Sequence, residues 1–129
     1  MQRLLRRQDF LAAARGRSRA AQGAVVQLRR RADDGPARIG FTVTRKLGGA
    51  VRRNRIRRRL KEAVRLAAAD HFRAGCDYVI VGRAATVDRP FAKLISDIIS
   101  AVDYLHRPEA ADNNAAGASG GRRLKQDSL

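Results

Sequence analysis

The sequence predicts one mixed α/β domain in which helices and strands follow each other along the chain. Three patterns favour this fold class: a strand-like alternation at 38–44, a basic segment with helical apolar spacing from 45 to about 69, and a β-branched apolar run at 78–81. A second helical pattern extends from about 90 to 105. With 129 residues, the chain has room for one domain with a modest core and tails.

The first predicted elements are short. Asp9 is expected to cap a helix from Phe10 to Arg15, and Gly16 is expected to end it. Residues 16–22 show no clear period, whereas the Ala-Val-Val-Gln-Leu run at 24–28 is typical of a strand. The polar residues 29–36 then form a predicted turn, in which the neighbouring acids Asp33 and Asp34 are expected to support turn geometry rather than bind a metal.

The segment 38–44 alternates cleanly between apolar and polar or small residues. Ile39, Phe41 and Val43 point to one side of the predicted strand. We expect a half-buried antiparallel strand, with Phe41 in the core. Gly48 and Gly49 then separate this strand from the long basic helix.

The basic helix has one apolar stripe and a charged remainder. Its apolar residues recur at steps of three and four: Ile56, Leu60, Ala63, Val64 and Ala67. Polar and basic side chains lie opposite at Asn54, Arg58, Lys61 and Arg65, with Arg53, Arg55, Arg57 and Arg59 along the flanks. Arg52 and Arg53 fall in the first turn, where the helix dipole disfavours cations. Such crowding is expected where a phosphate occupies the helix start.

The second half of the domain is predicted to contain a central strand and a final helix. The strand is the short run at 78–81. The helix opens at Asp88-Arg-Pro90, with Pro90 at its first position, and ends near 106–108. Its apolar stripe is Phe91, Leu94, Ile95, Ile98, Val102 and Leu105. We therefore expect a folded domain at 1–107 and a disordered polar and basic tail at 108–129.

The charge of the chain favours a polyanion partner over a metabolic substrate. Its 28 basic and 12 acidic residues give a net charge of +16. The acids are scattered and the only histidines are His71 and His106, so we expect neither a catalytic residue nor a metal site in the protein. Cys76 is expected to be a reduced core thiol, which favours the cytoplasm. No apolar run is long enough to span a membrane.

One continuous segment carries a family resemblance. Lys46-Leu-Gly-Gly-Ala-Val-Arg-Arg-Asn-Arg-Ile-Arg-Arg58, preceded by Arg38-Ile-Gly-Phe-Thr-Val-Thr-Arg45, resembles the signature of the protein subunit of bacterial ribonuclease P. The resemblance extends over about residues 3 to 106. It implies an α+β fold: an αβββαβα sandwich with a central mixed β-sheet, shared with a domain of a ribosomal protein, and with a left-handed βαβ crossover.

The resemblance also implies a role. A catalytic RNA subunit, with Mg²⁺, would remove the 5′ leader of precursor tRNA, and this chain would be its non-catalytic protein partner, with no other protein required. The residues expected to bind RNA are Lys46, Arg52, Arg53, Asn54, Arg55, Arg57, Arg58, Lys61 and Arg65. Phe10, Arg45 and Lys46 are expected in a cleft for the leader. The alternative is a ribosomal-type structural RNA-binding protein or a nonspecific nucleic-acid binder.

Two positions depart from the family pattern. Family members often carry further cleft aromatics where this chain has Ala14 and Gln27. Since a stacked aromatic contributes about 1–3 kcal/mol per base, we expect this cleft to hold the leader mainly by charge and with weak sequence preference.

Overall fold

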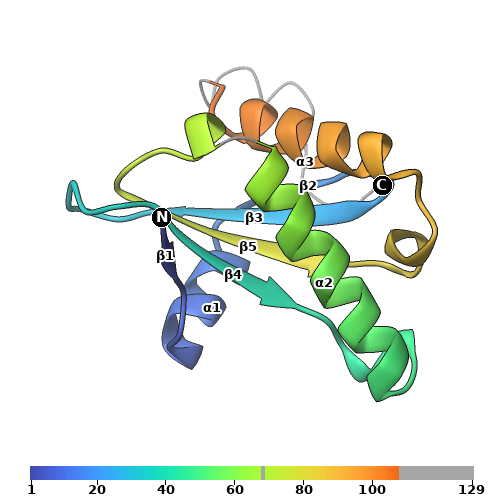
Figure 1. The fold of residues 1–129 in the computed structure, drawn as a ribbon. Coiled ribbons are helices and arrows are strands. Elements are labelled where there is room, and N and C mark those ends of the chain that lie inside the picture. Colours follow the sequence, from blue (N-terminus) through green and yellow to red (C-terminus); the bar gives the residue numbers. More distant parts are fainter. Residues whose placement is uncertain (68, 108–129) are drawn as a thin grey trace.

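A computed structural model describes residues 1–67 and 69–107 (Figure 1). Its centre is a five-stranded mixed sheet with the order β1-β4-β5-β3-β2. The strands are β1 (Gln2–Arg3), β2 (Arg17–Ala20), β3 (Ala24–Arg30), β4 (Arg38–Thr42) and β5 (Cys76–Gly82). The helices are α1 (Arg7–Ala14), α2 (Ala50–Leu66) and α3 (Phe91–Leu105), with short 3₁₀ turns η1 (Arg45–Leu47), η2 (Ala69–His71) and η3 (Ala84–Val87).

The direction of β4 differs from the prediction. We expected an antiparallel strand, but β4 runs parallel to both neighbours, β1 and β5. The reason is that α2 carries the chain back to the starting end of the sheet before β5 begins. In Figure 1, β4 and β5 point the same way, α2 passes in front of the sheet and β5 lies above β4, so the crossover is left-handed, as the resemblance implied.

The sheet is covered on both faces. Helices α2 and α3 pack on one face, where they meet Tyr78 and Ile80 of β5 and, as predicted, Phe41 of β4. Helix α1 packs on the other, where Leu4, Ala13 and Val79 form a second small core. Strand β5 is therefore buried from both sides at the centre of the sheet, as its unbroken apolar run predicted.

The predicted apolar stripe of α2 is buried as a whole. Ile56, Leu60 and Ala63 have no exposed surface, and Val64 and Ala67 are at most 5% exposed. Burying each large aliphatic side chain stabilises the fold by about 1.5–3 kcal/mol. The helix ends at Leu66, three residues earlier than predicted, and η2 follows. Its orientation on the sheet is thus fixed by its apolar side, which leaves the basic side free.

The N-terminal region contains the main elements that the sequence patterns missed. Strands β1 and β2 are short edge strands whose residues are almost all exposed, so neither has an apolar alternation to detect. The prediction that Asp9 caps α1 is wrong. Asp9 lies inside the first turn and is buried, and its carboxylate pairs with Arg29 at 3.2 Å. Helix α1 therefore starts earlier than expected, at Arg7.

A buried ion-pair cluster ties three strands together at the start of β5. The carboxylate of Asp77 is fully buried and accepts hydrogen bonds from Arg38 at 2.7 and 2.8 Å and from Arg31 at 2.7 Å. Burial alone would raise the pKa of Asp77, but these two arginines outweigh it and hold the pKa below its ordinary value. The cluster joins the end of β3, the start of β4 and β5.

The final helix matches its predicted span closely. Pro90 precedes α3 as the N-cap rather than occupying its first helical position, and α3 ends at Leu105. Leu94, Ile98 and Val102 have no exposed surface. Cys76 is a buried free thiol, as predicted. The tail predicted at 108–129 lies outside the described residues.

Candidate nucleic-acid interface

The outer side of α2 presents cations that have no partner in the described part of the protein. Arg55, Arg58 and Lys61 are exposed, and none makes an ion pair or hydrogen bond with a described residue. They lie three residues apart, so they follow each other along one side of the helix. We call them the basic face. Cations held this way remain available for phosphate groups.

Three other predicted RNA-binding residues, Asn54, Arg57 and Arg65, have partners within α2. Arg65 forms a pair with Glu62, joined by a 3.0 Å hydrogen bond from Nε, and Arg57 donates to the side-chain oxygen of Asn54 at 3.1 Å. Both pairs lie at the surface, where such contacts contribute little to stability and exchange readily for a ligand. Some of the predicted RNA-binding cations of α2 thus have no described partner, and others pair with a neighbouring side chain.

The two arginines in the first turn of α2 have a local structural role. Arg52 Nε donates to the carbonyl of Leu47 at 2.7 Å, and Arg53 Nε donates to the carbonyl of Gly48 at 3.1 Å. These carbonyls belong to the turn that leads into the helix, where Gly48 has a φ of 128° that favours glycine. The contacts offset the unfavourable position near the dipole, so an anion is not needed to explain Arg52 and Arg53.

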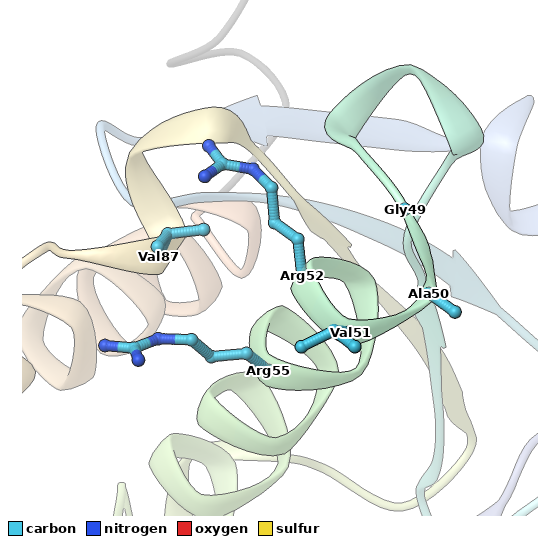
Figure 2. Close-up of a pocket in the computed structure, with 6 residues that line it drawn as sticks. All are labelled: Gly49, Ala50, Val51, Arg52, Arg55 and Val87. Atoms are coloured by element: carbon cyan, nitrogen blue, oxygen red, sulfur yellow. The ribbon is translucent and has the colours of Figure 1, made fainter.

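An open hollow lies beside the start of α2 (Figure 2). It has a volume of about 520 Å³ and is lined by Gly49, Ala50, Val51, Arg52, Arg55 and Val87. Arg52 and Arg55 extend from successive turns of α2 toward the side where Val87 lies. Free N–H groups of a helix start, together with guanidinium groups, suit a phosphate.

Val51 is a functional candidate that the sequence patterns missed. Its side chain is 85% exposed beside this hollow. The detectable signal is an apolar residue that lies off the buried stripe of the same helix. An exposed apolar side chain between arginines offers contact area for a base or a ribose.

The predicted leader residues occupy two places. The ring of Phe10 packs on β4 at Gly40, where an added Cβ would lie only 2.5 Å from two ring carbons. Arg45 and Lys46 lie in η1, just beyond the end of β4, and are exposed with no described partner. Ala14 is exposed on α1, and Gln27 pairs in register with Val79, whose side chain faces α1. Part of the Phe10 ring is therefore committed to packing.

Arg59 belongs to the same run of arginines but serves the fold. Its guanidinium donates to the carbonyl of Val87 at 3.0 Å and to that of Arg89, and lies 5.6 Å from the ring centre of Phe91. The side chain therefore fastens α2 to the segment that leads into α3.

We expect Arg59→Ala to lower the free energy of unfolding by about 1.5–3 kcal/mol, because two carbonyls lose a charged donor. In a domain of this size, each kcal/mol of lost stability lowers Tm by roughly 4–8 °C, so a thermal melt measures the effect. The neighbouring Arg58→Ala is the control, since the Arg58 side chain has no described partner. Equal Tm values for the two variants would contradict the structural role of Arg59.

The acidic and histidine side chains of the described residues do not gather into a metal site. Within them, no group of three or more His, Cys, Asp or Glu side chains is placed to hold a metal ion. Asp33 accepts the backbone N–H of Gly35 at 2.8 Å, as expected of a turn residue. No helix among the described residues is long and apolar enough to cross a membrane.

A basic helix exposed on a mixed sheet is typical of an RNA-binding protein. Comparison with known proteins agrees. The family described as Ribonuclease P matches residues 1–106. The chain is 43% identical to the ribonuclease P protein component of Caulobacter vibrioides over 123 residues, covering 95% of this chain and 80% of that protein. It is 48% identical to the one from Ruegeria pomeroyi over 110 residues, covering 82% of this chain and 87% of that protein.

Solved structures show the same fold. The ribonuclease P protein of Thermotoga maritima superposes with a TM-score of 0.63 at 28% identity, over 78% of this chain and 94% of that chain. That of Staphylococcus aureus gives a TM-score of 0.68 at 24% identity, over 82% and 96% of the two chains. The chain belongs to the ribonuclease P protein family.

Proposed function

We propose that this chain assists the removal of the 5′ leader from precursor tRNA while the RNA subunit performs the chemistry. The observation that carries the proposal is the basic face, whose three cations are exposed and make no pair with a described residue, on a helix that packing holds in place. Mg²⁺ would be held mainly by the RNA subunit and would activate the attacking water there. The protein supplies charge and position.

In this proposal the start of α2 and the basic face bind the catalytic RNA. Lys46, Arg52, Arg53, Asn54, Arg55, Arg57, Arg58, Lys61 and Arg65 are the contacts proposed. The free cations at 55, 58 and 61 bind phosphates directly, whereas the locally engaged ones exchange a carbonyl or carboxylate for a phosphate oxygen. Because packing fixes the helix before RNA arrives, only side chains need to become ordered on binding.

The 5′ leader of the substrate is proposed to lie between α1 and the sheet, near Phe10, Arg45 and Lys46. With Ala14 and Gln27 in place of aromatics, and part of the Phe10 ring packed on Gly40, base stacking is limited. Charge then dominates leader binding, which broadens the range of acceptable precursors. We place this assembly in the cytoplasm, with no further protein partner required.

The proposal is tested by adding the chain to a bacterial ribonuclease P RNA at low Mg²⁺ and measuring cleavage of a precursor tRNA. We expect the protein to restore cleavage that the RNA alone performs poorly, because added cations reduce repulsion between the two RNAs. The protein without RNA should not cleave. Cleavage by the protein alone, or no effect on the RNA, would contradict the proposal.

The leader role has its own test in Arg45→Ala/Lys46→Ala. We expect KM to rise about tenfold for precursors with a long leader, since each lost phosphate contact weakens binding. A precursor with a one-nucleotide leader is the matched substrate, and its KM should change little. An equal rise of KM for both substrates would show that Arg45 and Lys46 contact the catalytic RNA and not the leader.

A further inference from the structure

A second hollow lies at the opposite end of the sheet from the start of α2. It has a volume of about 240 Å³ and opens where β5 begins. Its lining comes from the end of β3, the turn before β5 and the end of α3: Arg30, Arg31, Asp33, Arg73, Ala74, Gly75, Cys76 and His106. We call it the β5-start hollow.

Two arginines at this hollow have no partner. Arg30 and Arg73 are exposed, and neither guanidinium makes an ion pair or hydrogen bond with a described residue. The acid in the lining, Asp33, is already occupied: it pairs with Arg31 at 3.0 Å and accepts the N–H of Gly35. The net charge facing the hollow is therefore positive.

The positive charge near the hollow also affects the pKa of His106. Burial first, and then the positive charges of Arg73 and Arg30, lower the pKa of His106 to about 4. His106 is thus neutral at physiological pH. Asp103 is the nearby acid that acts in the opposite direction, and its effect is smaller.

His106 also leaves a donor unsatisfied. The Tyr78 hydroxyl accepts the backbone N–H of Arg73 at 2.8 Å and lies 2.7 Å from His106 Nε2. Because burial raises the pKa of Tyr78, the hydroxyl stays protonated and can donate a hydrogen bond to Nε2. In the tautomer that accepts this bond, the neutral ring carries its proton on Nδ1, a buried atom with no partner among the described residues. Such a donor is costly unless an acceptor reaches it.

We propose that the β5-start hollow is a second phosphate-binding site, in which Arg30 and Arg73 bind a phosphate group of an RNA backbone. The shared chemistry is a phosphodiester oxygen, which two guanidinium groups can bind with charge-assisted hydrogen bonds. The RNA is either the catalytic subunit or the substrate precursor. This inference rests on the assignment of the chain to ribonuclease P and adds a contact outside α2 and the leader residues.

The hollow lies far from the start of α2, so a phosphate bound there would be a separate contact with RNA. The hollow lies at the first residue of β5, whereas the start of α2 lies beyond the last residue, beside Val87. Seven strand residues span roughly 20 Å, so the two sites are at least about that far apart. Two separated contacts on one rigid protein raise the overall affinity for RNA that reaches both.

The first experiment uses inorganic phosphate as the probe and NMR of the full chain as the readout. Phosphate should shift the ring signals of His106 and the Nε signals of Arg30 and Arg73 in a saturable way. Those shifts should vanish in Arg30→Ala/Arg73→Ala, while the signals of α2 still respond. Unmoved His106, Arg30 and Arg73 signals in the wild-type chain would overturn the proposal.

The second experiment measures RNA binding by the same double variant. Arg15→Ala/Lys93→Ala is the matched control, because it removes the same charge from two exposed side chains that have no described partner. We expect Arg30→Ala/Arg73→Ala to lose about tenfold in affinity, and its plot of log K against log salt to become shallower by roughly 1–2. Arg30→Lys/Arg73→Lys should restore most of the loss and so separates charge from folding.

The two RNAs are distinguished by where the loss occurs. Weaker binding to the catalytic RNA alone assigns the phosphate to that subunit. An unchanged affinity for that RNA, with a higher KM for precursor tRNA, assigns it to the substrate. Affinity and KM equal to those of the control would overturn the proposal. A wild-type chain that binds neither RNA would contradict the assembly itself as well as this site.

Discussion

Arg55→Ala/Arg58→Ala is expected to weaken binding to the ribonuclease P RNA by roughly 10- to 100-fold without unfolding the protein. Both side chains are exposed and have no described partner, so their loss removes phosphate contacts and no internal contact. The measurement is a titration at several salt concentrations. The plot of log K against log salt should become shallower by roughly 1.4–1.8, because two counterion-releasing contacts disappear.

Arg15→Ala/Lys93→Ala again serves as the matched control, since it removes two positive charges elsewhere on the surface. We expect its affinity to stay close to that of the wild-type chain, with a small general loss from the lower net charge. Equal losses for the two double variants would show that the protein binds RNA through overall charge and not through the basic face. A Tm that falls with Arg55→Ala/Arg58→Ala would give these residues a structural role.

Asp77→Ala is expected to have the largest effect on stability, about 3–5 kcal/mol, because it removes the fully buried carboxylate that pairs with both Arg38 and Arg31. The remaining acids are Asp9, at 3.7 Å from Arg38, and the exposed Asp33 beside Arg31. In a thermal melt the substitution lowers Tm by well over 10 °C for a domain of about 100 residues. Asp33→Ala is the matched control: Asp33 pairs with the same Arg31, but its side chain is 62% exposed. Its melting midpoint should change little.

The same cluster predicts how stability depends on pH. The pKa of Asp77 is held below its ordinary value of 3.8 in the folded protein, so the unfolded chain takes up this proton first as the pH falls. The contribution of Asp77 is therefore complete above its ordinary pKa and is lost as the pH drops through the lowered one. Acid unfolding of the wild-type chain should be steepest below about pH 4, and Asp77→Ala should flatten that dependence.

Elements with strong periodicity were predictable from the sequence. The stripe of Ile56, Leu60 and Val64 and the run at 78–81 gave α2 and the central strand, because both depend on side chains that must be buried. Strand direction was not predictable in the same way. The alternation at 38–44 is equally compatible with either direction, and only the connection through α2 makes β4 parallel to β5.

Predicting the candidate site was harder, because side-chain partners depend on tertiary contacts. Charge and spacing indicated the arginines of α2, yet they could not separate Arg58, which is free, from Arg59, which binds the carbonyl of Val87. The β5-start hollow brings together residues 30, 73 and 106, which no local pattern connects. The signature at 46–58 was enough to indicate the family, because one continuous segment holds its residues together.

The contact between Phe10 and Gly40 sets how closely α1 approaches the sheet. Helix α1 can approach the sheet this closely only because position 40 lacks a side chain, since even a methyl group there would meet the aromatic ring. The separation of α1 from β4 is thus governed by one missing carbon atom. If the leader lies between α1 and the sheet as proposed, variation at position 40 would be a simple evolutionary route to a wider or narrower space for it.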